Sequence, residues 1–278
     1  MTRPLILLTN DDGINSPGLA AAASGLDPLG ELLIIAPLDQ QTSMGRSRNT
    51  YGAGDGILHE VQVNYQDQSW TGYGLEASPA RVVEHAVLEI AKRPVSLVVS
   101  GINYGENIGT IITVSGTVGA ALEAADWGVP ALAVSQEIAG TDYRSYSKSV
   151  DFAAAAHFTR QIAEIILKEK LPFDTDLVKL EIPLSATADT KCVVTRLDRK
   201  QYYGTEIEER ESAFTMPAKV RHFALKGNYS KADTDAYALA QGWVSITPLS
   251  LDLSSRTPLN EIADLFNTQA LQDGKSSL

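Results

Sequence analysis

Short apolar runs alternate with helical segments over the first 185 residues, and this alternation constrains the fold more than any other feature of the chain. The run at residues 5–8 is continuously apolar and those at 31–37 and 95–100 are mostly apolar, which is typical of strands buried in a parallel sheet. Strands that alternate with helices pack into an α/β fold with a doubly wound, mostly parallel sheet. The crossovers between parallel strands are then right-handed.

Ser-Pro pairs mark the starts of two of the predicted helices. Ser16 with Pro17, and Ser78 with Pro79, each fit an N-cap followed by proline at the first helical position. A third helix is expected over residues 117–128, because a glycine and a nearby proline end the pattern there.

The pattern changes after residue 185. The segments that follow are separate β-like stretches joined by polar, aromatic-rich connections, and residues 258–271 have the periodicity of a final amphipathic helix. We therefore predict a metal- and phosphate-binding core over residues 1–185. Residues 186–278 are predicted to form β segments, a hairpin and a terminal helix that pack on the core or on a partner subunit.

Charge and cysteine content exclude several classes of protein. The formal net charge of −11 argues against a nucleic acid polymer as partner, because counterion release requires a basic face. The single cysteine, Cys192, rules out an intramolecular disulfide, and with four histidines it disfavours a Cys/His zinc site. The apolar run before Asp11 is too short for a signal peptide or a membrane span. We predict a cytoplasmic protein that does not bind membranes.

Polar, glycine-containing segments follow three of the predicted strands. In open α/β sheets the ligand crevice lies beyond the carboxyl ends of the strands, so these segments are expected to converge. The first carries Asp11 and Asp12, the second Ser43, and the third Asn103 and Asn107. A set of oxygen donors without sulphur suits Mg²⁺, Mn²⁺ or Ca²⁺. A cation would also relieve the repulsion between the adjacent aspartates.

Each of these residues also fits a simpler role when it is taken alone. An Asp-Asp pair before a helix fits an N-cap with a solvated neighbour. Ser43 fits a turn, and asparagines beside glycines fit left-handed backbone positions. The segment 115–117 fits both a plain helix cap and a phosphate-binding helix start. The coincidence of three such segments at strand ends favours the metal interpretation.

Other catalytic motifs are missing from the sequence or give no assignment. No Walker-type lysine motif or G-x-S-x-G elbow occurs, which disfavours a P-loop protein and a serine hydrolase. His59 and His222 lie in segments whose pattern predicts no role.

Taken together, the motifs resemble those of the SurE family of metal-dependent survival-protein nucleotidases. The matching stretches, in chain order, are "LTNDDGINSPG", "APLDQQTSMGRS", "VVSGINYGENIG", "SGTVGAALEA" and "GWVSITPLSLD". The resemblance implies a Rossmann-like core with a C-terminal oligomerisation hairpin that exchanges elements between subunits, giving a homodimer or homotetramer. It also implies hydrolysis of nucleoside 5′- and 3′-monophosphates, with broader phosphatase activity in some members.

The resemblance also implies roles for individual residues. One divalent ion per subunit, Mg²⁺ or Mn²⁺, is expected, and Asp11 and Asp12 are also the expected catalytic residues. Whether either aspartate acts as a base or attacks covalently stays open. The implied metal ligands are Asp11, Asp12, Ser43 and Asn103, and the implied phosphate pocket consists of Gly13, Asn107, Ser115, Gly116 and Thr117.

The sequence therefore predicts a 5′-nucleotidase that acts on nucleoside monophosphates or other small phosphomonoesters. Two alternatives come from other classes. A nucleotide- or sugar-binding module of the same fold would bind its ligand without releasing phosphate. A metal-dependent glycosyl or sugar-phosphate transferase would need an acceptor other than water.

Overall fold

A nine-stranded sheet forms the centre of the molecule, which we describe from a computed structural model over residues 3–48, 56–139 and 150–266. The strand order is β3-β4-β2-β1-β5-β6-β7-β11-β8. The strands from β4 to β7 are parallel, whereas β3 and β11 run antiparallel to their neighbours β4 and β7. Their bounds are β1 (Leu5–Thr9), β2 (Glu31–Pro37), β3 (Leu58–Tyr65), β4 (Gln68–Leu75), β5 (Leu97–Tyr104), β6 (Ala131–Gln136), β7 (Leu177–Ile182), β8 (Cys192–Val194) and β11 (Val244–Leu249).

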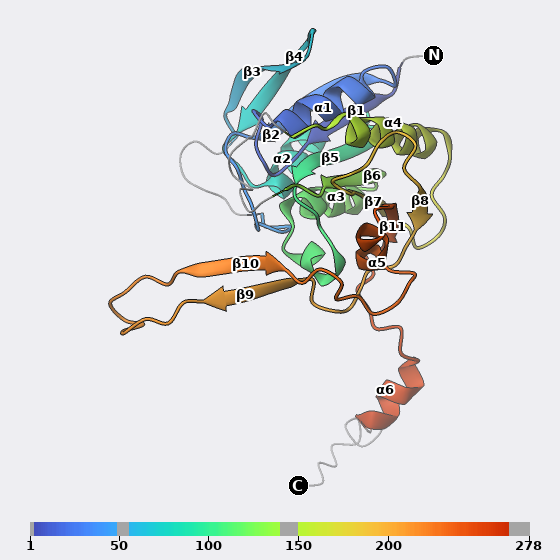
Figure 1. Cartoon of the computed structure of the whole chain (residues 1–278). Helices are drawn as coiled ribbons and strands as arrows, with labels where there is room; N and C mark the ends of the chain where they lie inside the picture. The colour runs from blue at the N-terminus through green and yellow to red at the C-terminus, as the bar shows by residue number, and fades with distance from the viewer. Residues whose placement is uncertain (1–2, 49–55, 140–149, 267–278) are drawn as a thin grey trace, which may run out of the picture.

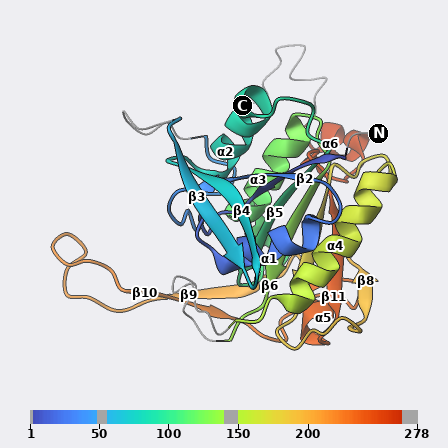
Figure 2. The same ribbon diagram turned by 90° about the horizontal axis from the view of Figure 1, so that it is seen from above.

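Helices cover both faces of this sheet. Helices α1 (Pro17–Leu26) and α4 (Ala153–Lys168) pack on one face, and α2 (Pro79–His85) and α3 (Gly116–Asp126) pack on the other (Figures 1 and 2). Side chains of β1 alternate between the two apolar layers: Ile6 and Leu8 contact the first layer, and Leu7 contacts the second. The predicted doubly wound α/β fold is confirmed.

The two Ser-Pro pairs start helices where the sequence predicted them. Helix α1 begins at Pro17 and α2 at Pro79. The hydroxyl of Ser78 accepts a hydrogen bond from the main-chain N–H of Arg81, as expected of an N-cap. The side chain of Ser16 makes no such bond, so proline and backbone geometry start α1 without a hydroxyl cap. Helix α2 continues into a π-helical turn, Ala86–Ile90.

Two elements had no clear signal in the sequence. The hairpin formed by β3 and β4 lies at one edge of the sheet, where many of its side chains are exposed and no buried apolar run develops. Helix α5 (Asp235–Ala240) is short, and its start is capped by the hydroxyl of Thr234, which accepts a hydrogen bond from Tyr237 N. His59 lies on β3.

The chain after residue 185 contributes both to the sheet and to features that extend from it. Strands β8 and β11 complete one edge of the sheet, so the sheet itself crosses the predicted domain boundary, and the division into two domains stays a prediction. Strands β9 (Tyr203–Ile207) and β10 (Val220–Ala224) form a separate hairpin, which carries His222 and extends away from the sheet (Figure 1).

The predicted terminal helix corresponds to α6 (Leu259–Leu265), which stands apart from the sheet and has no buried residue (Figure 1). The remainder of that prediction, residues 267–271, lies outside the described residues. Over the described ranges, every helix is too short or too polar to cross a membrane.

Candidate active site

The segments that follow β1 and β2 meet the end of β5 around the two adjacent aspartates, because β5 continues past the predicted run at residues 95–100 to Tyr104. The carboxylate of Asp12 accepts two hydrogen bonds, each with a donor–acceptor distance of 3.0 Å. Gln40 Nε2 donates to Oδ1, and the main-chain N–H of Tyr104 donates to Oδ2. The main-chain oxygen of Asp11 accepts from Gln41 N over 2.7 Å. One short stretch of the first segment therefore contacts both of the others, as the sheet topology predicted.

The start of α3 supplies a fourth side of the site. The hydroxyl of Thr117 donates to Oδ1 of Asp11 over 2.6 Å. A Cβ on Gly116 would lie 2.6 Å from Cβ of Asp11, so only glycine allows the helix to approach this closely. Ser115 caps the helix by accepting from Val118 N over 3.1 Å. Asp11 thus lies against the helix N-terminus, where the macrodipole favours negative charge.

A tight turn holds the aspartates at the end of β1. The side-chain amide of Asn10 donates to the main-chain oxygen of Gly13 and accepts from its N–H, each over 3.0 Å. Gly13 has a φ of 100°, a conformation that residues with a Cβ rarely adopt. The turn therefore requires both of these residues, although neither carries a charge.

Burial makes ionisation of the aspartate pair costly. Asp11 is 5% exposed and Asp12 is 2% exposed. Burial raises the pKa of Asp11 to about 6, although the hydrogen bond from Thr117 opposes that shift. Burial, and then the charge of Asp11, raise the pKa of Asp12 well above its ordinary value. A cation beside the pair would favour the ionised form of both carboxylates.

Ser43 lies on the segment that follows β2, and Asn103 lies near the end of β5, so both are close in sequence to residues that contact the aspartates. Ser43 is exposed and has a φ of 65°, a left-handed conformation that is uncommon for serine. The amide nitrogen of Asn103 donates to the main-chain oxygen of Gly105 over 2.7 Å, which leaves its oxygen as the atom that can bind a ligand. The contacts with the aspartates are made by their neighbours in sequence, Gln41 and Tyr104.

An ion-pair cluster anchors the Ser43 segment to α3. Arg46 Nε lies 2.7 Å from Glu123 Oε2, and Arg48 Nη2 lies 2.7 Å from Glu123 Oε1. The side chain of Glu123 is fully buried, so its two arginine partners are needed to offset the desolvation of its charge. Gly45 N also donates to Val114 O over 3.0 Å. Sequence reasoning did not identify this anchor, because its partners lie more than 70 residues apart.

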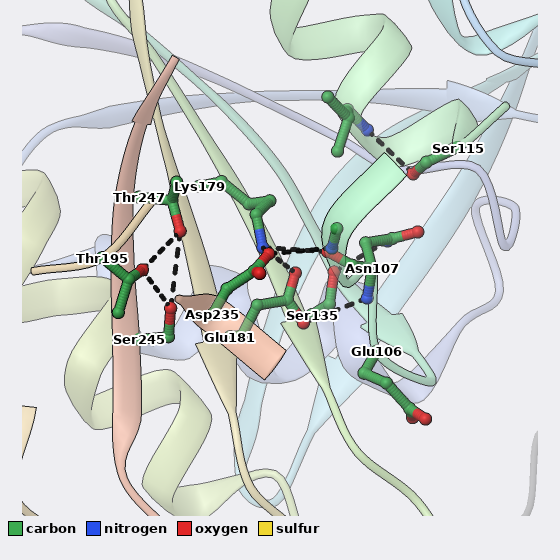
Figure 3. A network of polar contacts seen from close by, with 12 residues as sticks. Glu106, Asn107, Ser115, Ser135, Lys179, Glu181, Thr195, Asp235, Ser245 and Thr247 are labelled. Atoms are coloured by element: carbon green, nitrogen blue, oxygen red, sulfur yellow. Dashed lines mark hydrogen bonds and ion pairs between the residues drawn. The ribbon is translucent and has the colours of Figure 1, made fainter. Parts of the chain in front are cut away.

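Asn107 lies farther along the same edge of the sheet. Its amide nitrogen donates to Ser135 Oγ over 2.8 Å, and its main chain is held by groups of β7 (Figure 3). Within the described ranges, no hydrogen bond joins Asn107 directly to either aspartate. The structure therefore brings Gly116 and Thr117 into contact with Asp11 and places Asn107 against Ser135 and β7.

The side-chain atoms of the aspartates that could bind a metal ion are all oxygens. In the described parts of the chain, no three His, Cys, Asp or Glu side chains gather in a way that would hold a metal ion. Any cation at Asp11 and Asp12 must therefore draw its other protein ligands from neutral oxygens, such as those of Ser43 and Asn103. Two carboxylates with hydroxyl and amide oxygens suit Mg²⁺ or Mn²⁺.

A pocket of about 400 Å³ opens beside the Ser43 segment. Its size falls within the range of small-molecule sites. The lining combines apolar side chains with polar groups that can form hydrogen bonds, and consists of Leu38, Asp39, Gln41, Met44, Leu75, Glu76 and Ala77.

Known proteins share the sequence and the fold of this chain. The family model for survival protein SurE matches residues 6–204. The 5′-nucleotidase SurE of Thermococcus gammatolerans is 37% identical over 275 residues, which cover 98% of this chain and 99% of the relative. The 5′-nucleotidase SurE of Methanosarcina mazei is 38% identical over 270 residues, which cover 93% and 96%. The crystal structure of the SurE protein from Aquifex aeolicus matches with a TM-score of 0.72 at 29% identity, covering 95% of this chain and 100% of that one.

Proposed function

Because this chain belongs to the SurE family, we propose that it hydrolyses nucleoside monophosphates to nucleoside and phosphate at the site around Asp11 and Asp12. It is a 5′-nucleotidase, like the curated relatives that match it over nearly their whole length. Activity toward 3′-monophosphates and other small phosphomonoesters is part of the proposal.

The observation that carries the proposal is the pair of buried aspartates at the carboxyl edge of the sheet. Two adjacent carboxylates that are almost fully buried need a compensating charge. We assign that charge to one Mg²⁺ or Mn²⁺ per subunit. Its protein ligands would be Asp11, Asp12, Ser43 and Asn103, whose oxygen chemistry fits such an ion.

A divalent ion bound there would neutralise part of the phosphate charge and make the phosphorus atom more electrophilic. Residues of the chain then orient the phosphate group. The first turn of α3 presents main-chain N–H groups near Asp11, and helix N-termini bind phosphate oxygens. Gly13, Asn107, Ser115, Gly116 and Thr117 are assigned to the phosphate pocket, where they would stabilise the charge that develops on the equatorial oxygens.

At two of these residues, Thr117 and Ser115, the side-chain hydroxyl already makes a hydrogen bond within the protein. The hydroxyl of Thr117 is engaged with Asp11, and the main-chain N–H groups of Gly116 and Thr117 also face that carboxylate, so we assign Thr117 to orienting the carboxylate beside the phosphate. The hydroxyl of Ser115 is likewise engaged as the helix cap. Either aspartate can accept a proton from the attacking water or attack phosphorus directly, and both routes are consistent with the contacts described.

The pocket beside the Ser43 segment is our candidate for the nucleoside. It has room for a base and a sugar, and Asp39, Gln41 and Glu76 offer hydrogen-bonding groups along an apolar lining. Because Met44 and Gln41 belong to the segment that contacts the aspartates, a ligand in this pocket lies next to the proposed phosphate position.

We further assign the enzyme to a homodimer or homotetramer in the cytoplasm. The hairpin of β9 and β10 exposes Ile207, Val220 and Phe223, and α6 exposes Leu259 and Leu265. Apolar side chains gathered on projecting elements are typical of contacts between subunits. The exposed thiol of Cys192 is compatible with a reducing compartment.

Phosphate release tests the function directly. Nucleoside 5′- and 3′-monophosphates and simple esters should be assayed with Mg²⁺, with Mn²⁺ and with a chelator. We expect release that requires the metal and that the chelator abolishes. Binding of nucleotides without release of phosphate would instead support the non-catalytic module. Turnover only when a sugar or alcohol acceptor is added would support a transferase.

A further inference from the structure

A cluster of charged side chains lies fully buried beneath the segment that follows β5. It consists of Lys179 and Glu181 on β7 and Asp235 at the start of α5, and each of the three side chains is 0% exposed. Figure 3 shows the three side chains converging next to Asn107. They lie outside the donor set around Asp11 and Asp12, and the sequence analysis assigned them no role.

The strand pattern explains how two charges enter the core. Residues two apart on a strand point to the same face, so Lys179 and Glu181 share a face. Val178, Leu180 and Ile182 point to the opposite face, where they join the apolar layer under α1 and α4. Asp235 comes from a segment more than 50 residues later. The cluster therefore forms only when α5 packs against the sheet.

Lys179 uses all three of its N–H groups within the cluster. Its Nζ donates to the main-chain oxygen of Asn107 over 2.9 Å, to Asp235 Oδ2 over 3.1 Å and to Glu181 Oε1 over 3.3 Å. One ammonium group therefore joins two carboxylates to the backbone of the loop.

The carboxylates hold the same loop from the other side. Glu181 Oε2 accepts from Asn107 N over 3.0 Å, and Asp235 Oδ2 accepts from Gly109 N over 2.9 Å. Both main-chain polar groups of Asn107 are thus held by side chains of β7. Gly105 and Gly109, which flank Asn107, both have positive φ values, so the local sequence does little to restrict the backbone by itself.

We propose that Lys179, Glu181 and Asp235 are positioning residues that fix the main chain at Asn107 and so aim its side chain at the substrate phosphate. One N–H of the Asn107 amide donates to Ser135, and the second N–H remains for a phosphate oxygen. The inference rests on the proposed function, because that function places Asn107 in the phosphate pocket.

The charged character of the cluster supports positioning over simple stabilisation. A buried ion pair often contributes no more stability than apolar side chains of the same volume, because desolvation offsets the attraction between the charges. Such a cluster does restrict the loop at Asn107 to one backbone conformation, because any displacement of the loop would leave a buried charge without its partner.

Variants at Glu181 test the proposal. Glu181→Ala removes the acceptor for Asn107 N–H but leaves the Lys179–Asp235 pair, and Glu181→Gln keeps an oxygen at the same place. With the metal present, we expect Glu181→Ala to raise both KM and the inhibition constant of inorganic phosphate about tenfold, the loss expected for one hydrogen bond to a charged group. Glu181→Gln should recover most of that loss.

Thr195→Val provides the matched control. Thr195 Oγ1 lies 2.7 Å from Ser245 Oγ and 2.8 Å from Thr247 Oγ1, in a buried cluster of the same sheet that does not contact Asn107 (Figure 3). This variant should lower Tm while KM and the phosphate inhibition constant stay at the wild-type values. If Glu181→Ala behaves in the same way, the cluster is only structural and the proposal is overturned. If Glu181→Ala does not fold, Glu181→Met, which fills a similar volume but offers no oxygen acceptor to Asn107 N–H, takes its place, and unchanged constants with a lowered Tm in that variant overturn the proposal equally.

Direct calorimetric titration with inorganic phosphate separates this proposal from the proposed function. A wild-type protein that binds phosphate but hydrolyses no ester would contradict the function, and weaker binding by Glu181→Ala would still support the positioning role. A wild-type protein that binds no phosphate in the presence of Mg²⁺ or Mn²⁺ would contradict both.

Discussion

The hydroxyl of Thr117 lies 2.6 Å from Oδ1 of Asp11, so one hydrogen bond joins the first turn of α3 to the end of β1. This bond selects one rotamer of a carboxylate that burial would otherwise drive toward its protonated form. Gly116, which has no side chain, allows α3 to lie this close to Asp11. The chemistry proposed for the site therefore depends on a neutral side chain as well as on its charged residues.

Asp11→Asn should abolish metal-dependent hydrolysis, with a loss of at least about a hundredfold in kcat/KM. The amide keeps the shape of the side chain but removes a negative charge that would bind the cation. Phosphate release and calorimetric titration with Mn²⁺ measure the two effects. Asp189→Asn, at an exposed position, is the control and should behave as wild type. Full activity of Asp11→Asn would exclude the proposed site.

Thr117→Val should weaken metal binding and raise the pKa of Asp11 further, because the hydroxyl lowers that pKa. We expect about a tenfold weaker affinity for Mn²⁺ and a loss of about 1 kcal/mol in the free energy of unfolding. Thr117→Ser keeps the hydroxyl and should retain most of the affinity. Equal affinities for the two variants would show that the contact with Asp11 does not matter.

The affinity for Mn²⁺ should fall as pH decreases from 7 to 5. The pKa of Asp11 is about 6 in the metal-free protein, so below that value a proton must leave before the ion binds. The raised pKa of Asp12 extends proton release to higher pH. Calorimetry in two buffers with different ionisation enthalpies measures the protons released. An affinity independent of pH, with no proton release, would contradict the assignment of both aspartates.

Met44→Trp should raise KM for nucleoside monophosphates several-fold by filling part of the pocket beside the Ser43 segment. Glycerol phosphate, which has no base, should retain its wild-type KM. Steady-state kinetics with both substrates makes the comparison within one variant. An equal rise for both substrates would indicate a distorted metal site and argue against this pocket as the nucleoside position.

The order of the central strands and helices could be predicted because its signals are local. The apolar run of β1 and the Ser-Pro pair before α2 each carry their information within a few residues. Ligand sites in open α/β sheets lie at the carboxyl ends of the strands, so Asp12 was predicted to lie near the residues around Asn103. The hydrogen bond from Tyr104 N to Asp12 agrees with this prediction.

The supporting contacts could not be predicted in the same way. The two charges in "LVKLEIP" show that β7 is not a purely apolar strand, but nothing near them in sequence indicates Asp235 as their partner. Glu123 likewise gives no local sign of its two arginines. The hairpin of β3 and β4 gives only a weak local signal, because its exposed strands at the edge of the sheet need no continuous apolar run.

The bond between Asp12 and Tyr104 spans 92 residues, and the segment of Gln40 must dock on the same carboxylate. A partly folded chain therefore cannot assemble these groups, and a cation that requires them binds only the completed fold. Ion concentration and conformational stability are then thermodynamically linked, since a ligand specific for the native state lowers the unfolded population as its concentration rises. Removal of the divalent ion with a chelator should therefore lower the Tm of this protein. The Tm should rise with the concentration of Mg²⁺ or Mn²⁺.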